Sequence, residues 1–201
     1  MTRNTATWQT LRDSIRDDYE NYRRDWTKPG FRALAVYRFG VWARELRRDT
    51  TYRKLCGRFL DGVYILGMRR VRNHYGIELH RSAVVGKGVK FPHHGGVVIH
   101  HYARIGDNCV IQHGVTLGSA GRGVSRDQAP VLEDGVGVGP GAMILGKVTI
   151  GEGARIGPNV VVYTDVPAGA TLVAGSPRMI FAPKIDKTKN KGSDPDRGVI
   201  E

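Results

Sequence analysis

Cysteine is nearly absent from this sequence, which has only Cys56 and Cys109 among its 201 residues. Two cysteines so far apart form neither a disulfide framework nor a cysteine-based metal motif. Long apolar runs are missing too: the longest, at residues 63–68, is too short to cross a bilayer. The polar first 20 residues lack the apolar stretch of a secretory signal. We therefore expect a cytoplasmic protein, with peripheral membrane contact left open.

Acidic residues are scarce relative to basic ones, with 19 Asp and Glu against 31 Lys and Arg, so the formal net charge is +12. Such an excess suits an anionic partner, because summed charge steers association. Most of it lies in residues 1–80, which hold 17 basic and 9 acidic residues, ahead of the segment with the candidate chemistry. We interpret it as a solvated basic face and expect no nucleic-acid partner.

Residues 1–74 are predicted to form an α-helical N-terminal extension. Apolar residues recur at helical spacing after a break at Pro29-Gly30, with arginines on the opposite side. A second helix is predicted over about 51–71. Its expected apolar positions are Leu55, Phe59, Leu60, Val63 and Leu66. We expect these helices to pack on the rest of the protein or on a neighbouring subunit.

A six-residue period begins near Tyr75 and defines the second part of the chain. Large apolar residues recur at one position of the repeat: Leu79, Val85, Phe91, Ile99, Ile105, Ile111, Leu117, Leu132, Val138, Ile144, Ile150, Ile156 and Val162. Small or β-branched residues recur two positions earlier, as at Ala83, Val97, Cys109, Ala142 and Val160. A six-residue unit fits one short strand and a turn, so three units make a triangular coil with the large side chains inside.

The predicted fold is therefore mainly β: a parallel β-helix over residues 75–181, preceded by the helical extension. The period breaks at residues 92–98, where two residues are extra, and at residues 118–131, where a longer loop is extruded. Solenoids tolerate insertions as outward loops, commonly on the binding face. Residues 182–201 form a charged tail that we expect to be disordered.

Five of the seven histidines, His93, His94, His100, His101 and His113, fall within one coil and its neighbour. Neutral imidazoles bind zinc, but an imidazole is also the commonest general base near neutral pH. His93 follows Phe91 as His113 follows Ile111, so both are expected on the same face one coil apart. We interpret the other three as solvated surface residues.

Several motifs follow one another in order along this segment: residues 78–80, His93 with residues 96–99, then residues 114–118, 141–146 and 174–178. Together they resemble the serine acetyltransferase family of hexapeptide-repeat acyltransferases, including relatives that O-acetylate exopolysaccharide sugars. The resemblance implies a left-handed β-helix and a catalytic dyad of His93 and Glu78. An aliphatic hydroxyl needs such a base to attack a thioester, and a carboxylate orients and stabilises the imidazolium.

The resemblance also implies acetyl-CoA as the acyl donor, held in a groove between the β-helices of a homotrimer. The cofactor-binding residues expected from it are Gly118, Ser119, Ala142, Lys147, Arg155, Gly157 and Arg178. The cations among them suit the phosphates of coenzyme A. Neither cysteine resembles a covalent nucleophile, and no metal ligand set is predicted, so we expect direct transfer in a ternary complex.

The acceptor is less closely defined, because this sequence departs from the family around it. Pro92 stands where the family has Asp, and Gln128-Ala129 where it has an Arg-His pair, so groups that hold a zwitterion are missing. His113, Arg122 and Arg126 are the candidate acceptor-binding residues, and both L-serine and a sugar hydroxyl remain open. The final residues, Val199-Ile200-Glu201, differ from the family's Ile terminus, so we expect no partnership with cysteine synthase.

Two other classes of function remain as alternatives. Some left-handed β-helix proteins, the γ-class carbonic anhydrases, carry three-histidine zinc sites between subunits. A non-catalytic hexapeptide scaffold that uses its basic helices for assembly is the other alternative.

Overall fold

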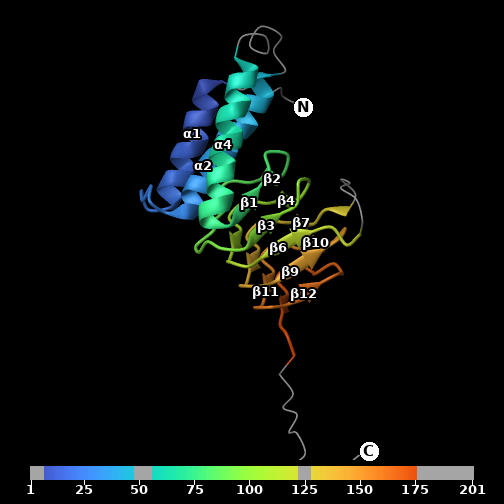
Figure 1. Cartoon of the computed structure of the whole chain (residues 1–201). Coiled ribbons are helices and arrows are strands. Elements are labelled where there is room, and N and C mark those ends of the chain that lie inside the picture. The colour runs from blue at the N-terminus through green and yellow to red at the C-terminus, as the bar shows by residue number, and fades with distance from the viewer. Residues whose placement is uncertain (1–6, 48–55, 122–127, 176–201) are drawn as a thin grey trace, which may run out of the picture.

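The computed structural model describes residues 7–47, 56–121 and 128–175. Three helices occur in these ranges: α1 (Trp8–Asn21), α2 (Pro29–Leu46) and α4 (Gly57–Tyr75). They stand side by side at one end of a stack of short strands, with α2 in contact with both α1 and α4 (Figure 1). Among the described helices, none has the length and apolar character needed to cross a membrane.

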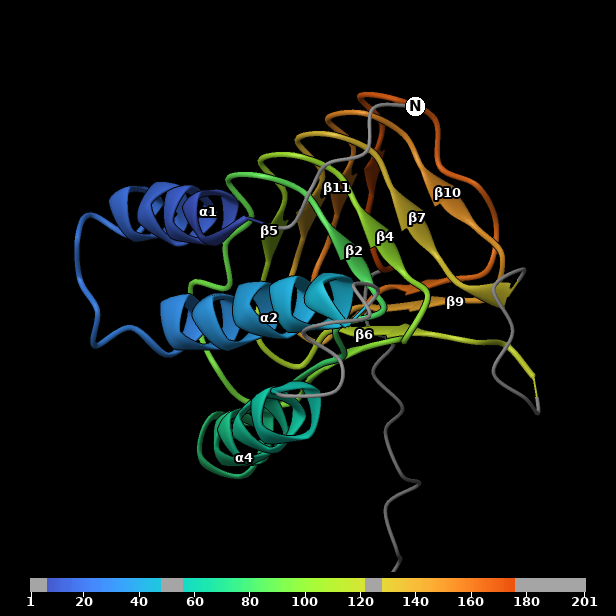
Figure 2. The same ribbon diagram turned by 90° about the horizontal axis from the view of Figure 1, so that it is seen from above.

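The strands form three parallel sheets that make the faces of a left-handed β-helix, as the repeat and the resemblance predict. The first sheet contains β1 (Ile77–Leu79), β3 (Val97–Ile99), β6 (Thr116–Gly118), β9 (Met143–Leu145) and β12 (Val161–Val162). The second contains β2 (Val84–Val85), β4 (Arg104–Ile105), β7 (Val131–Leu132) and β10 (Thr149–Ile150). The third contains β5 (Val110–Ile111), β8 (Gly137–Val138), β11 (Arg155–Ile156) and β13 (Thr171–Leu172). Figure 2 shows the successive coils stacked behind the helices.

The core of the β-helix consists of the two repeat positions read from the sequence. All thirteen predicted large residues, from Leu79 to Val162, are at most 6% exposed, and the small residues two positions earlier are buried beside them. From β1 to β12, each strand alternates a buried side chain with a less buried one, as expected for period-two geometry, whereas both residues of β13 are exposed. The fold prediction is therefore confirmed.

The predicted second helix corresponds to α4, and its expected first residues, 51–55 with Leu55, lie outside the described part of the chain. It begins at Gly57 and ends at Tyr75, where Gly76 adopts the left-handed conformation of a helix C-cap, with φ of 60°. Its buried face carries Tyr64 and Val71, whereas Phe59 is 74% exposed and Leu66 is 65% exposed. Apolar residues occur on both sides of α4, so helical spacing alone could not identify the buried side.

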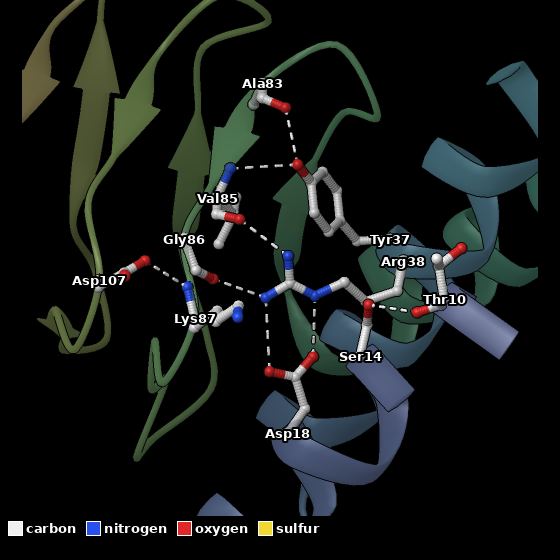
Figure 3. A network of polar contacts seen from close by, with 10 residues as sticks. All are labelled: Thr10, Ser14, Asp18, Tyr37, Arg38, Ala83, Val85, Gly86, Lys87 and Asp107. Atoms are coloured by element: carbon white, nitrogen blue, oxygen red, sulfur yellow. Dashed lines mark hydrogen bonds and ion pairs between the residues drawn. The ribbon is translucent and has the colours of Figure 1, made fainter. Parts of the chain in front are cut away.

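The helical extension caps the open end of the β-helix. In the second coil, the carbonyl oxygens of Ala103 and Ile105 accept hydrogen bonds from backbone N–H groups of the first coil. The equivalent carbonyls of the first coil have no coil before them. Tyr37 Oη donates to the oxygen of Ala83 at 2.7 Å, and Arg38 Nη1 donates to that of Val85 at 2.8 Å (Figure 3). Side chains of α2 thus replace the missing coil, which satisfies an edge that would otherwise be exposed.

An ion pair behind this cap joins α1 to α2. Arg38 Nε donates to Asp18 Oδ2 at 2.9 Å, and Arg38 Nη2 donates to the carbonyl oxygen of Gly86 at 2.6 Å (Figure 3). Burial of Asp18 raises the pKa of its carboxyl group, and the opposing effect of Arg38 is smaller. The pair therefore fixes the position of α1 more than it contributes net stability.

Candidate active site

His93 and His113 lie at the same corner of the β-helix, on successive coils. His93 precedes β3 and His113 precedes β6. Their ring centroids are 5.9 Å apart and the rings are nearly perpendicular, at 84°. Both side chains are exposed. The predicted juxtaposition is confirmed, and it presents two imidazoles to solvent at one point.

The turn that carries His93 is held against the end of α4. The two extra residues of this repeat are accommodated by Gly95 and Gly96, which have φ of 105° and 67°. The Gly95 N–H donates to the Tyr75 carbonyl at 2.8 Å, and the Val97 N–H donates to the Gly76 carbonyl at 2.9 Å. The last helical residues therefore determine where the His93 turn lies.

Glu78 points outward from β1 and is exposed. In the sheet it lies opposite Val98 of the next coil. Within the described residues it makes no hydrogen bond or ion pair with His93. The proposed dyad therefore stays a prediction.

A second histidine cluster occupies a different corner, between the first and second sheets, and the sequence did not indicate it. The rings of His80 and His101 are stacked with centroids 4.1 Å apart and an interplanar angle of 6°. Burial, followed by the neighbouring His101 and Arg81, lowers the pKa of His80 to about 4. Burial likewise lowers the pKa of His100, and its Nε2 is shielded without a hydrogen-bond partner among the described residues. The expectation that His100 is simply solvated is therefore wrong.

The residues expected to bind the acyl donor lie at separate places on one chain. Gly118, Ser119 and Lys147 lie at the corner between the first and second sheets, where Gly146 N donates to Gly118 O at 2.9 Å. Gly157 lies at another corner, after Arg155 on the third sheet. The side chain of Ala142 is fully buried in the core, so only its backbone can meet a ligand. Arg122, Arg126 and Arg178 lie outside the described residues.

The positions that depart from the family pattern carry no charge in the structure either. Pro92 and Gln128 are exposed, whereas Ala129 is 5% exposed. None of these side chains can form an ion pair with an ammonium or a carboxylate group.

A hollow of about 520 Å³ over the second sheet is a poor candidate for the donor site. Four carboxylates, Asp107, Glu133, Asp134 and Glu152, and one guanidinium, Arg104, are among its lining residues. Asp107 and Asp134 accept hydrogen bonds from backbone N–H groups of neighbouring coils, both at 2.7 Å. These acids hold the turns, and their charge would repel the phosphates of coenzyme A.

Metal binding was the other interpretation of the clustered histidines. Across residues 7–47, 56–121 and 128–175, no group of three His, Cys, Asp or Glu side chains is arranged to hold a metal ion.

Comparison with known proteins first identifies the class. Residues 129–164 match the family model described as bacterial transferase hexapeptide (six repeats). The coils and this match together define a hexapeptide-repeat transferase.

Similarity to individual proteins identifies the family. The serine acetyltransferase of Helicobacter pylori strain J99 is 43% identical over 152 residues, which cover 76% of this chain and 81% of that protein. The serine acetyltransferase of Synechococcus elongatus is 39% identical over 155 residues, but the chain spans only 57% of that protein's length. Soybean serine acetyltransferase complexed with serine superimposes with a TM-score of 0.67 and 33% identity, covering 86% of this chain and 70% of that chain.

A further solved structure agrees. Neisseria gonorrhoeae serine acetyltransferase in complex with serine gives a TM-score of 0.64 and 29% identity, covering 83% of this chain and 68% of that one. The chain belongs to the serine acetyltransferase family, which confirms the resemblance stated from its motifs.

Proposed function

We propose that this protein is an acetyl-CoA-dependent O-acetyltransferase that acts on a hydroxyl of a small acceptor. The observation that carries the proposal is the 43% identity to a serine acetyltransferase over 81% of that relative's length. The exposed His93 at a corner of the β-helix supplies the base that such a reaction needs. The same relationship does not favour a carbonic-anhydrase-like zinc enzyme.

His93 takes the acceptor's proton as the hydroxyl oxygen attacks the thioester carbonyl carbon. The carbon–sulfur bond then breaks, and the proton passes from the imidazolium to the departing thiolate of coenzyme A. Glu78 is the residue proposed to orient the imidazole and stabilise its charged form.

Direct transfer is supported by the state of the cysteines. Cys109 is fully buried, its thiol donates to the Glu133 carbonyl at 3.1 Å, and burial raises its pKa to about 11. Cys56 is exposed at the start of α4, outside the β-helix. A buried thiol with a raised pKa is a poor nucleophile, so a covalent acetyl-enzyme on Cys109 is not part of the mechanism.

The donor site is proposed to form between copies of the chain. Gly118, Ser119 and Lys147 lie at one corner of the β-helix and Gly157 at another, so one subunit alone does not bring them together. A groove between two β-helices can combine residues from different corners, which supports the homotrimer expected from the resemblance. The cytoplasmic location stays a prediction.

The acceptor is proposed to be L-serine or a sugar hydroxyl. The relatives are serine acetyltransferases, which favours serine. The uncharged Pro92, Gln128 and Ala129 favour a neutral acceptor, because an unpaired ammonium or carboxylate in a partly desolvated site costs several kcal/mol. A thiol-release assay with acetyl-CoA and each acceptor, at equal enzyme, distinguishes them.

The test of the reaction itself is His93→Ala. We expect turnover to fall by about a hundredfold or more, with the fold and the affinity for coenzyme A unchanged. His113→Ala is expected to lose less, and His94→Ala, an exposed neighbour, serves as the matched control. Equal losses in all three variants would contradict a single base. Zinc in stoichiometric amounts, whose removal abolished thiol release, would instead support the metalloenzyme alternative.

A further inference from the structure

The chain segment that carries His93 is anchored at its start by a buried tyrosine of the helical layer. Phe91 is 1% exposed, and its backbone N–H donates to Tyr22 Oη at 2.7 Å. The chain then continues through Pro92 to His93, and both of these residues are exposed. The anchored residue therefore lies only two positions before the candidate base.

Tyr22 takes the place of a coil that the β-helix does not have. In the second coil, the residue equivalent to Phe91 is Ile111, and its N–H donates to the Lys90 carbonyl of the first coil at 2.9 Å. No coil precedes the first one, so the phenol oxygen of Tyr22 accepts the hydrogen bond of Phe91 instead. A buried N–H group without an acceptor costs free energy, which keeps this backbone group on the phenol.

Tyr22 is itself held in place by two helices. It is the C-cap of α1, and its N–H donates to the Asp18 carbonyl at 3.1 Å. Its ring lies beside that of Phe31 of α2, with centroids 6.2 Å apart. At Gly30 the backbone of α2 is so close that a Cβ would overlap Tyr22 Oη and the Phe91 carbonyl oxygen. Burial raises the pKa of the phenol to about 12, so the group stays neutral.

The other end of the segment is anchored by the end of α4. The Tyr75 carbonyl accepts from the Gly95 N–H at 2.8 Å. The Gly76 carbonyl accepts from the Val97 N–H at 2.9 Å. Exposed residues 92–94 thus lie between two anchors, and the helical layer supplies both of them.

We propose that Tyr22 is a positioning residue for His93 and acts through the backbone of Phe91. This inference rests on the proposed O-acetyl transfer and names a residue outside the β-helix on which the geometry of that reaction depends. A general base must lie within hydrogen-bond reach of the hydroxyl, and a displacement of about 1 Å can cost about a hundredfold in rate. Without the phenol, only the α4 anchor fixes the segment that carries the imidazole.

The first test is Tyr22→Phe, which removes the phenol oxygen and keeps the ring. We expect kcat for thiol release to fall about tenfold, as for a displacement of less than 1 Å, while KM for acetyl-CoA stays unchanged. Urea unfolding of the same protein measures how much stability is lost.

Tyr37→Phe is the matched control. Tyr37 Oη accepts from the Val85 N–H at 3.2 Å and donates to the Ala83 carbonyl at 2.7 Å. This variant therefore loses the same kind of hydrogen bond to the same coil, but at β2 instead of the His93 segment. We expect a similar shift of the urea midpoint and the kcat of the wild type. Equal kcat values in Tyr22→Phe and Tyr37→Phe would refute the positioning role.

A second pair of variants displaces the segment without removing the phenol, and it decides the question even if Tyr22→Phe does not fold. Gly30→Ala places a Cβ against the Phe91 carbonyl, whereas Gly40→Ala, on the same helix, places one against the Tyr64 ring. We expect kcat to fall about tenfold in Gly30→Ala only. The same kcat in both variants would contradict the proposal.

Failure of the proposed reaction can be told apart from failure of the positioning role. If no acceptor releases thiol, O-acetyl transfer is wrong, and NMR of protein labelled with carbon-13 at histidine Cε1 then reports on His93 directly. The His93 signal is identified by its loss in His93→Ala. We expect it to shift or broaden in Tyr22→Phe and to stay in place in Tyr37→Phe. A signal that is unchanged in both variants, or changed equally in both, overturns the role of Tyr22.

Discussion

Arg38 connects three parts of the molecule, and its replacement by Met removes those connections while keeping most of the side-chain volume. The guanidinium bonds to Asp18 of α1 at 2.9 Å and to two carbonyl oxygens of the first coil, those of Val85 and Gly86. Arg38→Met leaves the carboxylate of Asp18, a residue that is 1% exposed, without its partner. Both carbonyls lose their donor at the same time.

The expected loss of unfolding free energy is about 3 kcal/mol, the lower end of the 3–5 kcal/mol usual when one partner of a buried ion pair is removed. The lower end applies because the Arg38 side chain is 15% exposed, so some water can reach the vacated site. Asp18→Asn in the Arg38→Met background should recover part of the loss, since it removes the buried charge.

The pH dependence of this variant follows from the raised pKa of Asp18. A carboxyl group whose pKa is higher in the folded protein stabilises the fold below its unfolded pKa, and that contribution is lost as pH rises through the folded pKa. Removal of Arg38 raises the pKa further. The difference in stability between Arg38→Met and the wild type should therefore narrow as the pH falls toward 4.

Equilibrium urea unfolding, followed by tryptophan fluorescence at one protein concentration, measures these changes. Arg16→Met is the control, because Arg16 is 59% exposed and its surface ion pairs should contribute less than about 1 kcal/mol. An Arg38→Met protein as stable as Arg16→Met at neutral pH would refute the view that Arg38 completes the end of the β-helix.

Three further outcomes are expected. Glu78→Gln should give a kcat for thiol release between those of the wild type and His93→Ala, because the amide keeps a hydrogen bond but not the charge that stabilises the imidazolium. A Glu78→Gln protein with the kcat of the wild type would exclude the dyad. Gly40→Ala should lower the free energy of unfolding by about 1–3 kcal/mol, because a Cβ at this position would overlap the Tyr64 ring. Gly62→Ala has open space around it and should be neutral or stabilising. Equal shifts of the urea midpoint in both variants would contradict the close packing of Gly40 against Tyr64. The pKa of His80 falls from 6.5 to about 4 on folding, so its contribution to stability is complete above pH 6.5 and is lost between pH 6.5 and 4. His80→Gln should therefore show a smaller drop in Tm between pH 7 and pH 5 than the wild type. An equal drop in the two proteins would show that His80 does not cause this loss of stability.

The fold of the second part of the chain could be predicted residue by residue, because in a solenoid the position of a residue within its repeat determines whether its side chain is buried. Each unit places one large and one small side chain inward, as Ile105 and Ala103 do, and the next coil repeats the choice. The same periodicity predicted that His93 and His113 would be neighbours on successive coils. Each coil forms hydrogen bonds with the next coil at equivalent positions of the repeat, so the contacts of the β-helix can be predicted without knowing how segments far apart in the sequence pack.

The helical layer and the candidate site depend on contacts that no repeat encodes. Tyr37 and Arg38 reach backbone groups more than forty residues away, and an arginine in a helix pattern reads equally well as a solvated side chain. The exposed Phe59 and buried Tyr64 show the same limit, because α4 is apolar on both sides.

The sequence by itself determined the β-helix, its buried positions and the pairing of His93 with His113, since these depend on spacing along a regular repeat. Only the tertiary structure decided how the first coil is capped, that His80 stacks on His101, and that Tyr22 holds the backbone of Phe91. Those features arise where a helix meets a coil. At these places, the residues in contact are far apart in the sequence, and only the three-dimensional packing of helix and coil brings them together.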